Sequence, residues 1–397
     1  MITEKYTIKH IQFWQIILSL GAASLFIFAT MYFMQPLLPL LTESFQISVS
    51  YASLAMSMTT IGLIFGLLAI GFMSDRHGRT KFIHLSIICS TILLFIIPLL
   101  KMFIFIIILR FVQGFLLAGL LSAALAYMAE EIDPKHFGFA TTLYISCNSI
   151  GGMMGRFVTG YIAEQYTWQI TMYILAIFGV VTFLLVLFNL PTSRYFTGVQ
   201  SKVKEDLKGF VVHFKNPTLL LMFGLGMVLQ IAFTGMWTYL PFHLLEAPYE
   251  LSLKEISYFY FAYSLGVIGA PIAGLLTARF NISHLRVAGV FILCSGMMIT
   301  LGSSLVLITI GLCIVCLGFF ISHALATATV SQTATHHKGS ASSLYLVAYY
   351  LGVSLGTTSL APLWESYQWM GVILFTAILP AIYVFLVKGY QTMQTKK

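Results

Sequence analysis

The sequence predicts an all-α membrane protein in which twelve transmembrane helices form two pseudo-symmetric six-helix bundles. Three observations lead to this prediction. The 397-residue chain is 59% hydrophobic and only 9% charged, whereas a soluble domain carries about 25% charged residues. Apolar runs of about 20 residues, the length that crosses a bilayer as a helix, follow one another along the whole chain. Short sequence patterns of the first half also recur in the second half.

The apolar runs are bounded by charged residues and turns, and they give the predicted spans in order. These spans cover 12–34, 51–72, 82–100, 103–126, 138–162, 169–190, 218–241, 256–278, 285–303, 305–328, 340–361 and 369–388. The first run is longer than the apolar core of a signal peptide and lacks a clear small-residue cleavage site, so we expect it to remain as the first span. A chain built this way is a multi-pass protein of the cell membrane.

The basic residues predict the orientation of these spans. Of the 21 lysines and arginines, only Lys101 and Lys254 fall in loops on one side, Arg110 and Arg156 fall within spans, and the remainder lie in the loops and tails on the other side. Basic residues concentrate in cytoplasmic loops. We therefore expect both termini to be cytoplasmic, and we expect the net charge of +8 to reflect this bias and not a nucleic-acid-binding surface.

The two halves of the chain contain related patterns at a constant spacing. Tyr-Thr-Trp ending at Trp168 returns as Tyr-Gln-Trp ending at Trp369, and Gly-x-x-x-Gly at 151–155 returns at 352–356, both shifted by 201 positions. Parallel internal repeats of this kind occur in membrane transporters. We therefore predict an N-terminal bundle over 1–190, a cytoplasmic linker over 191–217 and a C-terminal bundle over 218–397.

A charged turn, Gly-Phe-Met-Ser-Asp-Arg-His-Gly-Arg-Thr-Lys at 71–81, separates the second and third spans. Five of its residues match the pattern Gly-x-Leu-Ala-Asp-Arg-x-Gly-Arg-Lys: Gly71, Asp75, Arg76, Gly78 and Arg79. The turn resembles the loop between helices 2 and 3 of the major facilitator superfamily. This resemblance implies a gating loop in which Asp75 and Arg79 help to hold the cytoplasmic ends of the two halves together.

Small residues in the fourth and fifth spans predict close helix packing. They are Gly114, Gly151, Gly152, Gly155 and Gly160. Glycines four residues apart let helix backbones approach closely. The fifth span is similar to the antiporter motif of proton-coupled drug exporters, although Arg156 stands where that motif has proline. Gln-Pro-Leu-Leu-Pro at 35–39 resembles the acriflavine-sensitivity-type branch of bacterial efflux permeases instead.

Ionisable and polar residues within spans are the candidates for the substrate and proton pathway. A charge in the middle of a span is costly, so Arg110 should face a partner or a watery cavity. Arg-x-x-x-Gly at 110–114 resembles the family's fourth-span motif, which implies proton coupling or substrate contact; a structural arginine bonded to backbone carbonyls is the alternative. His323 is a candidate protonation switch. The full set is Arg110, Gln113, Asn148, Arg156, Tyr32, Gln35, Gln230 and His323.

Two further patterns bear on the substrate. Carboxylates fall in loops or at span ends, whereas two arginines lie within spans, which favours an anionic or neutral solute. Aromatic residues in spans 1, 7, 8 and 11 could stack on such a solute, although some belong to the interfacial belt. These aromatic residues are Tyr32, Trp237, Tyr239, Tyr258, Tyr260, Tyr263, Tyr345, Tyr349 and Tyr350.

These patterns together predict a secondary active transporter that exports a small organic solute or drug, coupled to protons, by alternating access. The alternative is a proton-linked importer of an organic anion or sugar. The loops contain no catalytic or metal-binding cluster and no Gly-x-x-x-x-Gly-Lys-Ser/Thr pattern. We therefore expect no enzymatic activity, no cofactor, no metal and no nucleic-acid partner, and the resemblance implies a monomer that works in the lipid bilayer.

Overall fold

The computed structural model describes residues 5–198, 211–334 and 338–395, and most of these residues are helical. The chain divides into two compact units, Met1–Ser201 and Lys202–Lys397. The only extended pairing within the described ranges is a single parallel bridge between Tyr6 and Ile132. Residues 199–210 of the predicted linker lie outside the described residues.

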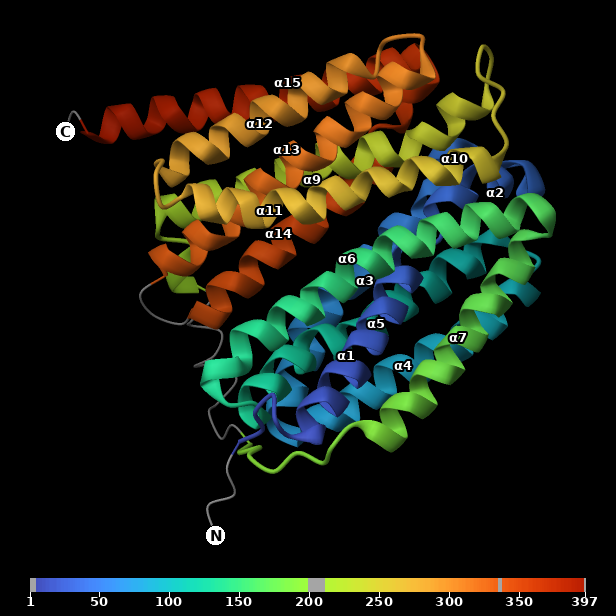
Figure 1. Cartoon of the computed structure of the whole chain (residues 1–397). Helices are drawn as coiled ribbons and strands as arrows, with labels where there is room; N and C mark the ends of the chain where they lie inside the picture. The colour runs from blue at the N-terminus through green and yellow to red at the C-terminus, as the bar shows by residue number, and fades with distance from the viewer. Residues whose placement is uncertain (1–4, 199–210, 335–337, 396–397) are drawn as a thin grey trace. The chain divides into compact units, whose positions relative to one another are not determined.

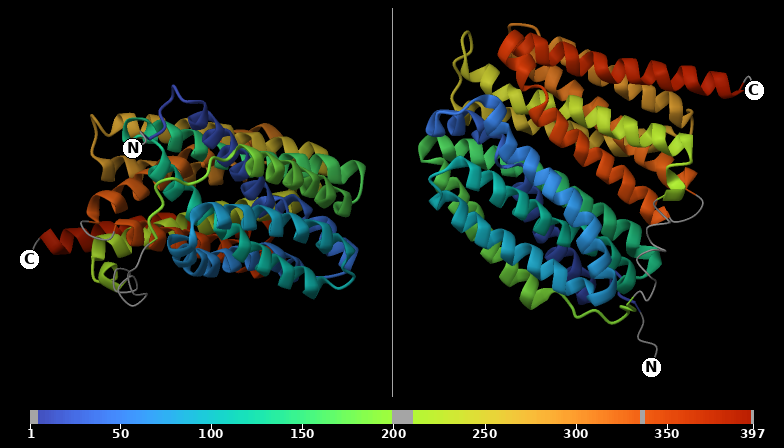
Figure 2. Two further views of the ribbon diagram at one scale, coloured as in Figure 1. Left: turned by 90° about the horizontal axis from the view of Figure 1, so that it is seen from below. Right: turned by 180° about the vertical axis from the view of Figure 1, so that it is seen from behind.

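Helices of each unit run lengthwise beside one another (Figure 1; Figure 2, right). The first unit contains α1 (Ile11–Tyr32), η1 (Gln35–Leu37), α2 (Leu38–Phe45), α3 (Val49–His77), α4 (Arg79–Ile96), η2 (Ile97–Leu99), α5 (Phe103–Glu131), α6 (Pro134–Gln165) and α7 (Trp168–Asn189). The second contains α9 (Pro217–Leu245), α10 (Leu253–Phe259), η3 (Tyr260–Ala262), α11 (Tyr263–Leu276), α12 (Ile282–Ile299), α13 (Leu305–Thr333), α14 (Lys338–Thr358) and α15 (Ala361–Thr395).

Within the described residues, 10 helical segments are long and apolar enough to cross a membrane. The other two predicted spans correspond to α6 and α14, which have 32 and 21 residues. Both helices are long enough for a bilayer of about 30 Å, but serines, threonines and glycines lower their hydropathy. They occupy equivalent positions in the two halves, and each contains the Gly-x-x-x-Gly pattern.

Equivalent helix pairs pack together in both units, so the two halves that share sequence patterns also share a helix arrangement. In the first unit α1 packs on α6 and α7, α3 packs on α5, and α4 packs on α5 and α7. In the second unit α9 packs on α14 and α15, α11 packs on α13, and α12 packs on α13 and α15. Each unit is therefore a six-helix bundle with the same internal arrangement.

Local sequence explains where several helices begin and end. Ser48 accepts a hydrogen bond from the Tyr51 N–H at the start of α3, and Asn216 does the same for the Thr218 N–H at the start of α9. Such side-chain acceptors satisfy N–H groups that have no partner within the helix. Between α3 and α4 the chain turns at Gly78, whose φ of 101° favours glycine.

Two predicted spans have different limits in the structure. The run 256–278 is not one helix, because the 3₁₀ turn η3 separates α10 from α11. The predicted span 340–361 ends slightly too late, because α14 ends at Thr358. The predicted start of the last span at 369 agrees with a break inside α15, where Gln368 has a left-handed φ of 51° and separates two helical stretches. Hydropathy detects the apolar runs but not the 3₁₀ turn within 256–278.

Candidate transport site

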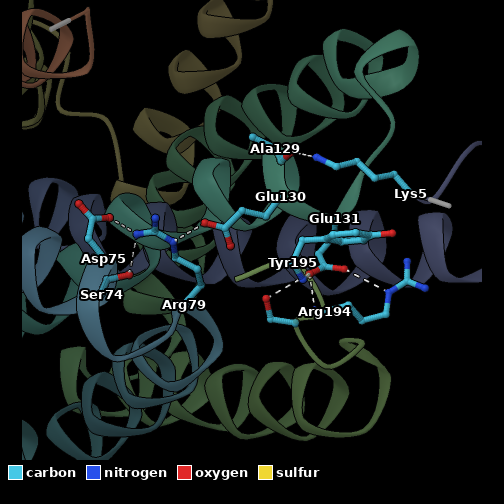
Figure 3. Close-up of polar contacts among 10 residues, drawn as sticks. Lys5, Ser74, Asp75, Arg79, Ala129, Glu130, Glu131, Arg194 and Tyr195 are labelled. Atoms are coloured by element: carbon cyan, nitrogen blue, oxygen red, sulfur yellow. Dashed lines mark hydrogen bonds and ion pairs between the residues drawn. The ribbon is translucent and has the colours of Figure 1, made fainter. Parts of the chain in front are cut away.

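The predicted gating loop forms an ion-pair cluster at the end of the first bundle. Arg79 lies in the first turn of α4 and pairs with Asp75 in the last turn of α3. Its Nε also lies 3.1 Å from a carboxylate oxygen of Glu130 on α5 (Figure 3). Arg79 is only 8% exposed, so its two acidic partners balance a nearly desolvated charge. The cluster thus fastens α3, α4 and α5 together at one end.

The other residues of this loop have different roles. The Arg76 guanidinium donates to the Phe72 carbonyl, with 3.0 Å between Nη1 and the oxygen. Gly78 provides the turn described above. Gly71 lies on α3, and a Cβ built there would be 3.9 Å from the Ser122 Cβ, an ordinary contact distance. In this cluster, ion pairs join Arg79 to Asp75 and to Glu130.

Glu131, next to Glu130, is a second acidic centre, and its side chain is fully buried. One carboxylate oxygen accepts hydrogen bonds from the backbone N–H groups of Arg194 and Tyr195, at 2.6 and 3.1 Å, and from the Ser193 hydroxyl. The other oxygen lies 3.4 Å from the Arg194 Nε (Figure 3). Glu131 therefore holds the segment that follows α7 against the C-terminal end of α5.

The N-terminal segment is attached at the same place. The Tyr6 N–H donates to the Glu131 carbonyl at 2.9 Å, and the Lys5 ammonium donates to the Ala129 carbonyl at 2.8 Å. The Arg194 guanidinium also lies over the Tyr6 ring, 3.7 Å from its centroid. Glu130 and Glu131 thus connect the predicted gating loop, the N-terminal segment and the segment that follows α7. The sequence did contain a signal for this site. Two adjacent carboxylates follow the predicted fourth span, on the side where the loops are rich in basic residues.

Replacing Glu131 with glutamine should lower the free energy of unfolding by about 2 kcal/mol, because several donors lose a charged, buried acceptor. Thermal unfolding of the purified protein in detergent measures the effect. Glu164→Gln is the matched control, because Glu164 is an exposed carboxylate near the end of α6. Equal stability of Glu131→Gln and wild type would contradict the role given to Glu131.

Arg110 is fully buried inside the first bundle and bonds mainly to backbone carbonyls. Its Nη1 and Nη2 donate to Thr30 and Met31 in the last turn of α1, at 3.0 and 3.3 Å, and its Nε donates to Ala55 on α3 at 3.2 Å. It also donates to the Gln113 Oε1, while the Gln113 Nε2 donates to the Ser90 carbonyl on α4. This arrangement matches the structural alternative for Arg110.

The reason for these bonds lies in the end of α1. The last carbonyls of a helix have no N–H partner within it, and Thr30 and Met31 stand in the last turn of α1. Arg110 provides the missing donors and places a positive charge at the negative end of the helix dipole. A desolvated arginine is tolerated here because carbonyl groups and Gln113 accept its hydrogen bonds.

Four other predicted pathway residues lie along the contact between α1 and α6. The Arg156 Nε donates to the Gln35 Oε1 at 2.6 Å, and the guanidinium lies over the Tyr32 ring, 4.1 Å from its centroid. Two turns earlier on α6, Asn148 accepts a hydrogen bond from the Ser24 hydroxyl. Arg156 is only 4% exposed, so it does not extend toward lipid headgroups. We call Tyr32, Gln35, Asn148 and Arg156 the α1–α6 polar cluster.

The predicted interhelix glycines lie mostly at backbone contacts. A Cβ built on Gly151 or Gly155 would be 2.6 Å from the backbone of Leu25 or Ala29 on α1, and one on Gly114 would be 1.8 Å from the Thr59 carbonyl on α3. Gly152 faces the Tyr32 ring, and Gly160 is buried. Gly352 and Gly356 repeat this pattern in the second unit, where added Cβ atoms would meet the α9 backbone.

The predicted pathway residues of the second unit lie among aromatic rings. The His323 Nδ1 on α13 is 2.8 Å from the Tyr345 hydroxyl on α14. Its ring lies parallel to Phe319, with 5.6 Å between centroids. Gln230 on α9 is 2% exposed. Tyr345 was one of many aromatic residues in the sequence, and neither hydropathy nor motifs indicated that it would bond to His323.

Taken together, the helical bundles, the charged loop between the second and third spans, and the polar and aromatic groups at membrane depth define a polytopic membrane transporter. The family model of the Major Facilitator Superfamily matches residues 20–357. The chain belongs to the Major Facilitator Superfamily.

Similar proteins match 62% to 96% of the chain. An uncharacterized transporter of Buchnera aphidicola subsp. Schizaphis graminum (strain Sg) is 33% identical over 379 residues, 96% of this chain and 91% of the relative. The inner membrane transport protein YnfM of Escherichia coli (strain K12) is 32% identical over 371 residues, 94% and 89%. The benzoate transport protein of Acinetobacter baylyi (strain ATCC 33305 / BD413 / ADP1) is 27% identical over 292 residues, 62% and 60%.

Solved structures share the fold at low sequence identity. A bacterial homolog of the human lysosomal transporter Spinster has a TM-score of 0.78 at 14% identity, covering 94% of this chain and 96% of that chain. A D-xylose-proton symporter has a TM-score of 0.75 at 13% identity, covering 93% and 97%. These likenesses extend over both bundles and concern the fold.

Proposed function

We propose that this transporter exports a small organic solute in exchange for protons, by alternating access, with His323 as the protonated group. The observation that carries this proposal is the place of His323, within α13 and hydrogen-bonded to Tyr345. Histidine is the side chain whose unperturbed pKa lies closest to neutral pH, so His323 is by type the intramembrane group best suited to take up and release protons. The Gln-Pro-Leu-Leu-Pro resemblance to efflux permeases at 35–39 supports the direction of transport.

The distribution of carboxylates supports His323 further. In the described part of the chain, aspartates and glutamates stand in loops or near helix ends, as Asp75, Glu130 and Glu131 do. The carboxylates of the gating cluster are already engaged with Arg79 and Arg194. His323 is half-buried and lies toward the middle of a 29-residue helix, where a proton carrier would be needed.

Replacing His323 with glutamine should reduce pH-gradient-driven flux at least tenfold and leave solute counterflow within about twofold, because only the coupled step needs the proton. Both rates are measured in proteoliposomes with the same solute. Tyr345→Phe keeps the ring and removes the hydroxyl bonded to His323, so it should give an intermediate loss. Gradient-driven flux that survives His323→Gln would move the proton site to a span-end carboxylate, with Glu43, Glu130 and Glu255 as candidates.

A second candidate function is proton-linked import of an organic anion. The α1–α6 polar cluster favours it, because Arg156 with Gln35 and Tyr32 is a cationic, hydrogen-bonding group at membrane depth. The name of the benzoate transport protein, whose solute is a carboxylate, points in the same direction.

The direction of a proton gradient separates the two candidates. With acid outside right-side-out vesicles, a proton antiporter empties preloaded vesicles, whereas a proton symporter fills them. The assay uses a cationic dye and a lipophilic organic anion as probes, on wild type and Arg156→Gln. Anion uptake that is lost in Arg156→Gln would establish the importer, and loss of preloaded solute would establish the exporter.

A further inference from the structure

Arg286, in the second turn of α12, is a buried cation of the second bundle and is only 5% exposed. Its Nη1 donates to the Thr329 hydroxyl on α13 at 2.8 Å, and its Nη2 lies 3.4 Å from the Ser283 hydroxyl, a long and weak contact. A guanidinium has five N–H donors. Within the described ranges Arg286 pairs with no carboxylate, and most of its donors have no acceptor.

Two buried arginines of the first bundle have stronger acceptors than Arg286. Arg79 pairs with two carboxylates. Arg110 donates to three backbone carbonyls and to the Gln113 side chain. A buried cation is tolerated where an opposite charge or several hydrogen-bond acceptors balance it, and two hydroxyl groups provide neither. The guanidinium of Arg286 therefore needs an anion that the described part of the chain does not supply.

A small pocket between α9, α12 and α15 borders the Arg286 side chain. Its polar lining comes from Ser283, Arg286 and Lys388, and its apolar lining from Met222, Leu225, Val287, Val384 and Val387. The pocket has a volume of about 20 Å³, which is room for about one group of the size of water. It can admit an oxygen atom of an anion, whereas a whole organic solute does not fit. The pocket and the missing anionic partner are independent observations, and both indicate an anionic ligand.

The end of the second bundle that contains this pocket is basic. Lys215 precedes α9, Arg279 precedes α12, and the exposed Lys388 lies near the end of α15. The carboxylates that the structure describes in this unit lie at the opposite ends of the helices, after α9 and at the starts of α10 and α15; they are Glu246, Glu250, Glu255 and Glu365. Basic pockets between the ends of transmembrane helices attract the headgroups of anionic lipids.

An apolar surface for acyl chains lies on the same two helices. α12 and α15 pack side by side (Figure 1). Phe291 on α12 and Phe385 on α15 are 42% and 62% exposed, and their rings meet edge to face, with 6.0 Å between centroids. Lipid tails are as apolar as such side chains, so exposed rings of a membrane-spanning bundle contact lipid. This surface favours an amphiphile over a free anion, because only an amphiphile can occupy both the pocket and the rings.

We propose that Ser283, Arg286 and Lys388 bind the phosphate group of an anionic phospholipid. A phosphate oxygen enters the pocket and accepts hydrogen bonds from Arg286 and from the Ser283 hydroxyl, and Lys388 adds a second positive charge at the exposed edge. Hydrogen bonds between arginine and phosphate are charge-assisted and therefore strong. The acyl chains lie along α12 and α15. This site is separate from the proposed solute and proton pathway, and its occupancy does not depend on the direction or coupling of transport.

Native mass spectrometry of the full-length protein in detergent measures the binding of three probes. Phosphatidylglycerol has a net negative headgroup, phosphatidylcholine with the same acyl chains has a neutral one, and glycerol 3-phosphate has the phosphate without acyl chains. We expect phosphatidylglycerol to bind about tenfold more tightly than phosphatidylcholine, because two basic side chains attract the net charge. Glycerol 3-phosphate should bind at least 100-fold more weakly than phosphatidylglycerol, because it lacks the buried methylene groups.

Variants assign this preference to the pocket. Arg286→Gln keeps a polar side chain but removes the charge, and it should bind the two lipids equally within about twofold. Arg279→Gln is the matched control, because it removes the same charge from an exposed position at the same end of the bundle. It should keep the preference for phosphatidylglycerol. Ser283→Ala leaves the arginine in place and should lower the preference about threefold, which tests the pocket even if Arg286→Gln does not fold.

Three results would overturn the site: equal binding of the two lipids to wild type, an unchanged preference in Arg286→Gln or, if that variant does not fold, in Ser283→Ala, or an equal loss in Arg286→Gln and Arg279→Gln. The last result would mean that the basic end attracts anionic lipid without a defined pocket. Glycerol 3-phosphate that binds as tightly as phosphatidylglycerol would overturn the assignment to a lipid.

Discussion

Replacing Arg110 with alanine is expected to lower the free energy of unfolding by about 3–5 kcal/mol, the range for breaking a buried, hydrogen-bonded charge site. The substitution removes the Arg110 donors from the carbonyls of Thr30 and Met31. The Ala55 carbonyl loses Arg110 but keeps the Thr59 hydroxyl. These groups lie inside the bundle, away from bulk water. Thermal unfolding in detergent and the yield of folded protein after membrane extraction measure the loss.

Two further variants make this result specific. Arg110→Lys keeps the charge but not the planar fork that reaches carbonyls on two helices, so it should recover only part of the stability. Arg279→Ala removes an exposed arginine in the turn after α11 and should change little. If Arg110→Ala unfolds at the wild-type temperature but loses transport, Arg110 acts on the solute or the proton and its structural role is wrong.

The second large effect is expected at Gly114. A Cβ at this position would lie 1.8 Å from the Thr59 carbonyl oxygen and 2.7 Å from its carbonyl carbon. Both atoms belong to the α3 backbone, so no side chain can move aside and the whole helix must shift. Gly114→Ala should therefore lower the free energy of unfolding by about 3 kcal/mol, the upper part of the range for overpacking.

Gly138→Ala is the matched control for Gly114→Ala. Gly138 lies in α6, and a Cβ there would meet no atom within 4 Å. Alanine stabilises a helix interior relative to glycine by about 0.5–1 kcal/mol, so the control should gain stability while Gly114→Ala loses it. Thermal unfolding of the two variants side by side gives the comparison. Equal effects would mean that α3 and α5 can separate at little cost, which tight packing does not allow.

The two predictions concern different ways in which the first bundle tolerates close packing. Gly114 lets the α3 and α5 backbones touch, and Arg110, one turn earlier on α5, donates to carbonyls of α1 and α3. On α5, a glycine and an arginine in adjacent turns therefore hold the neighbouring helices α1 and α3 in place.

The sequence by itself determined the class of this protein. Low charge and repeated apolar runs predict membrane helices because the bilayer requires about 20 apolar residues for each span. The constant spacing between 168 and 369, and between 151 and 352, predicted two related halves, and the helix pairs of the two bundles agree. The loop at 71–81 indicated the family to which the chain belongs. These signals are local or periodic, so they can be read along the chain.

Only the tertiary structure decided which polar groups meet. Arg110 was predicted to need a partner, but the carbonyls of Thr30 and Met31 are 80 and 79 residues away in the chain. The bond between Arg156 and Gln35 joins residues 121 apart, and Glu131 holds backbone N–H groups of a segment that has no distinctive pattern. Such contacts depend on how helices pack and where α1 ends. Hydropathy predicts that a side chain is buried, but helix packing decides which atoms it meets there.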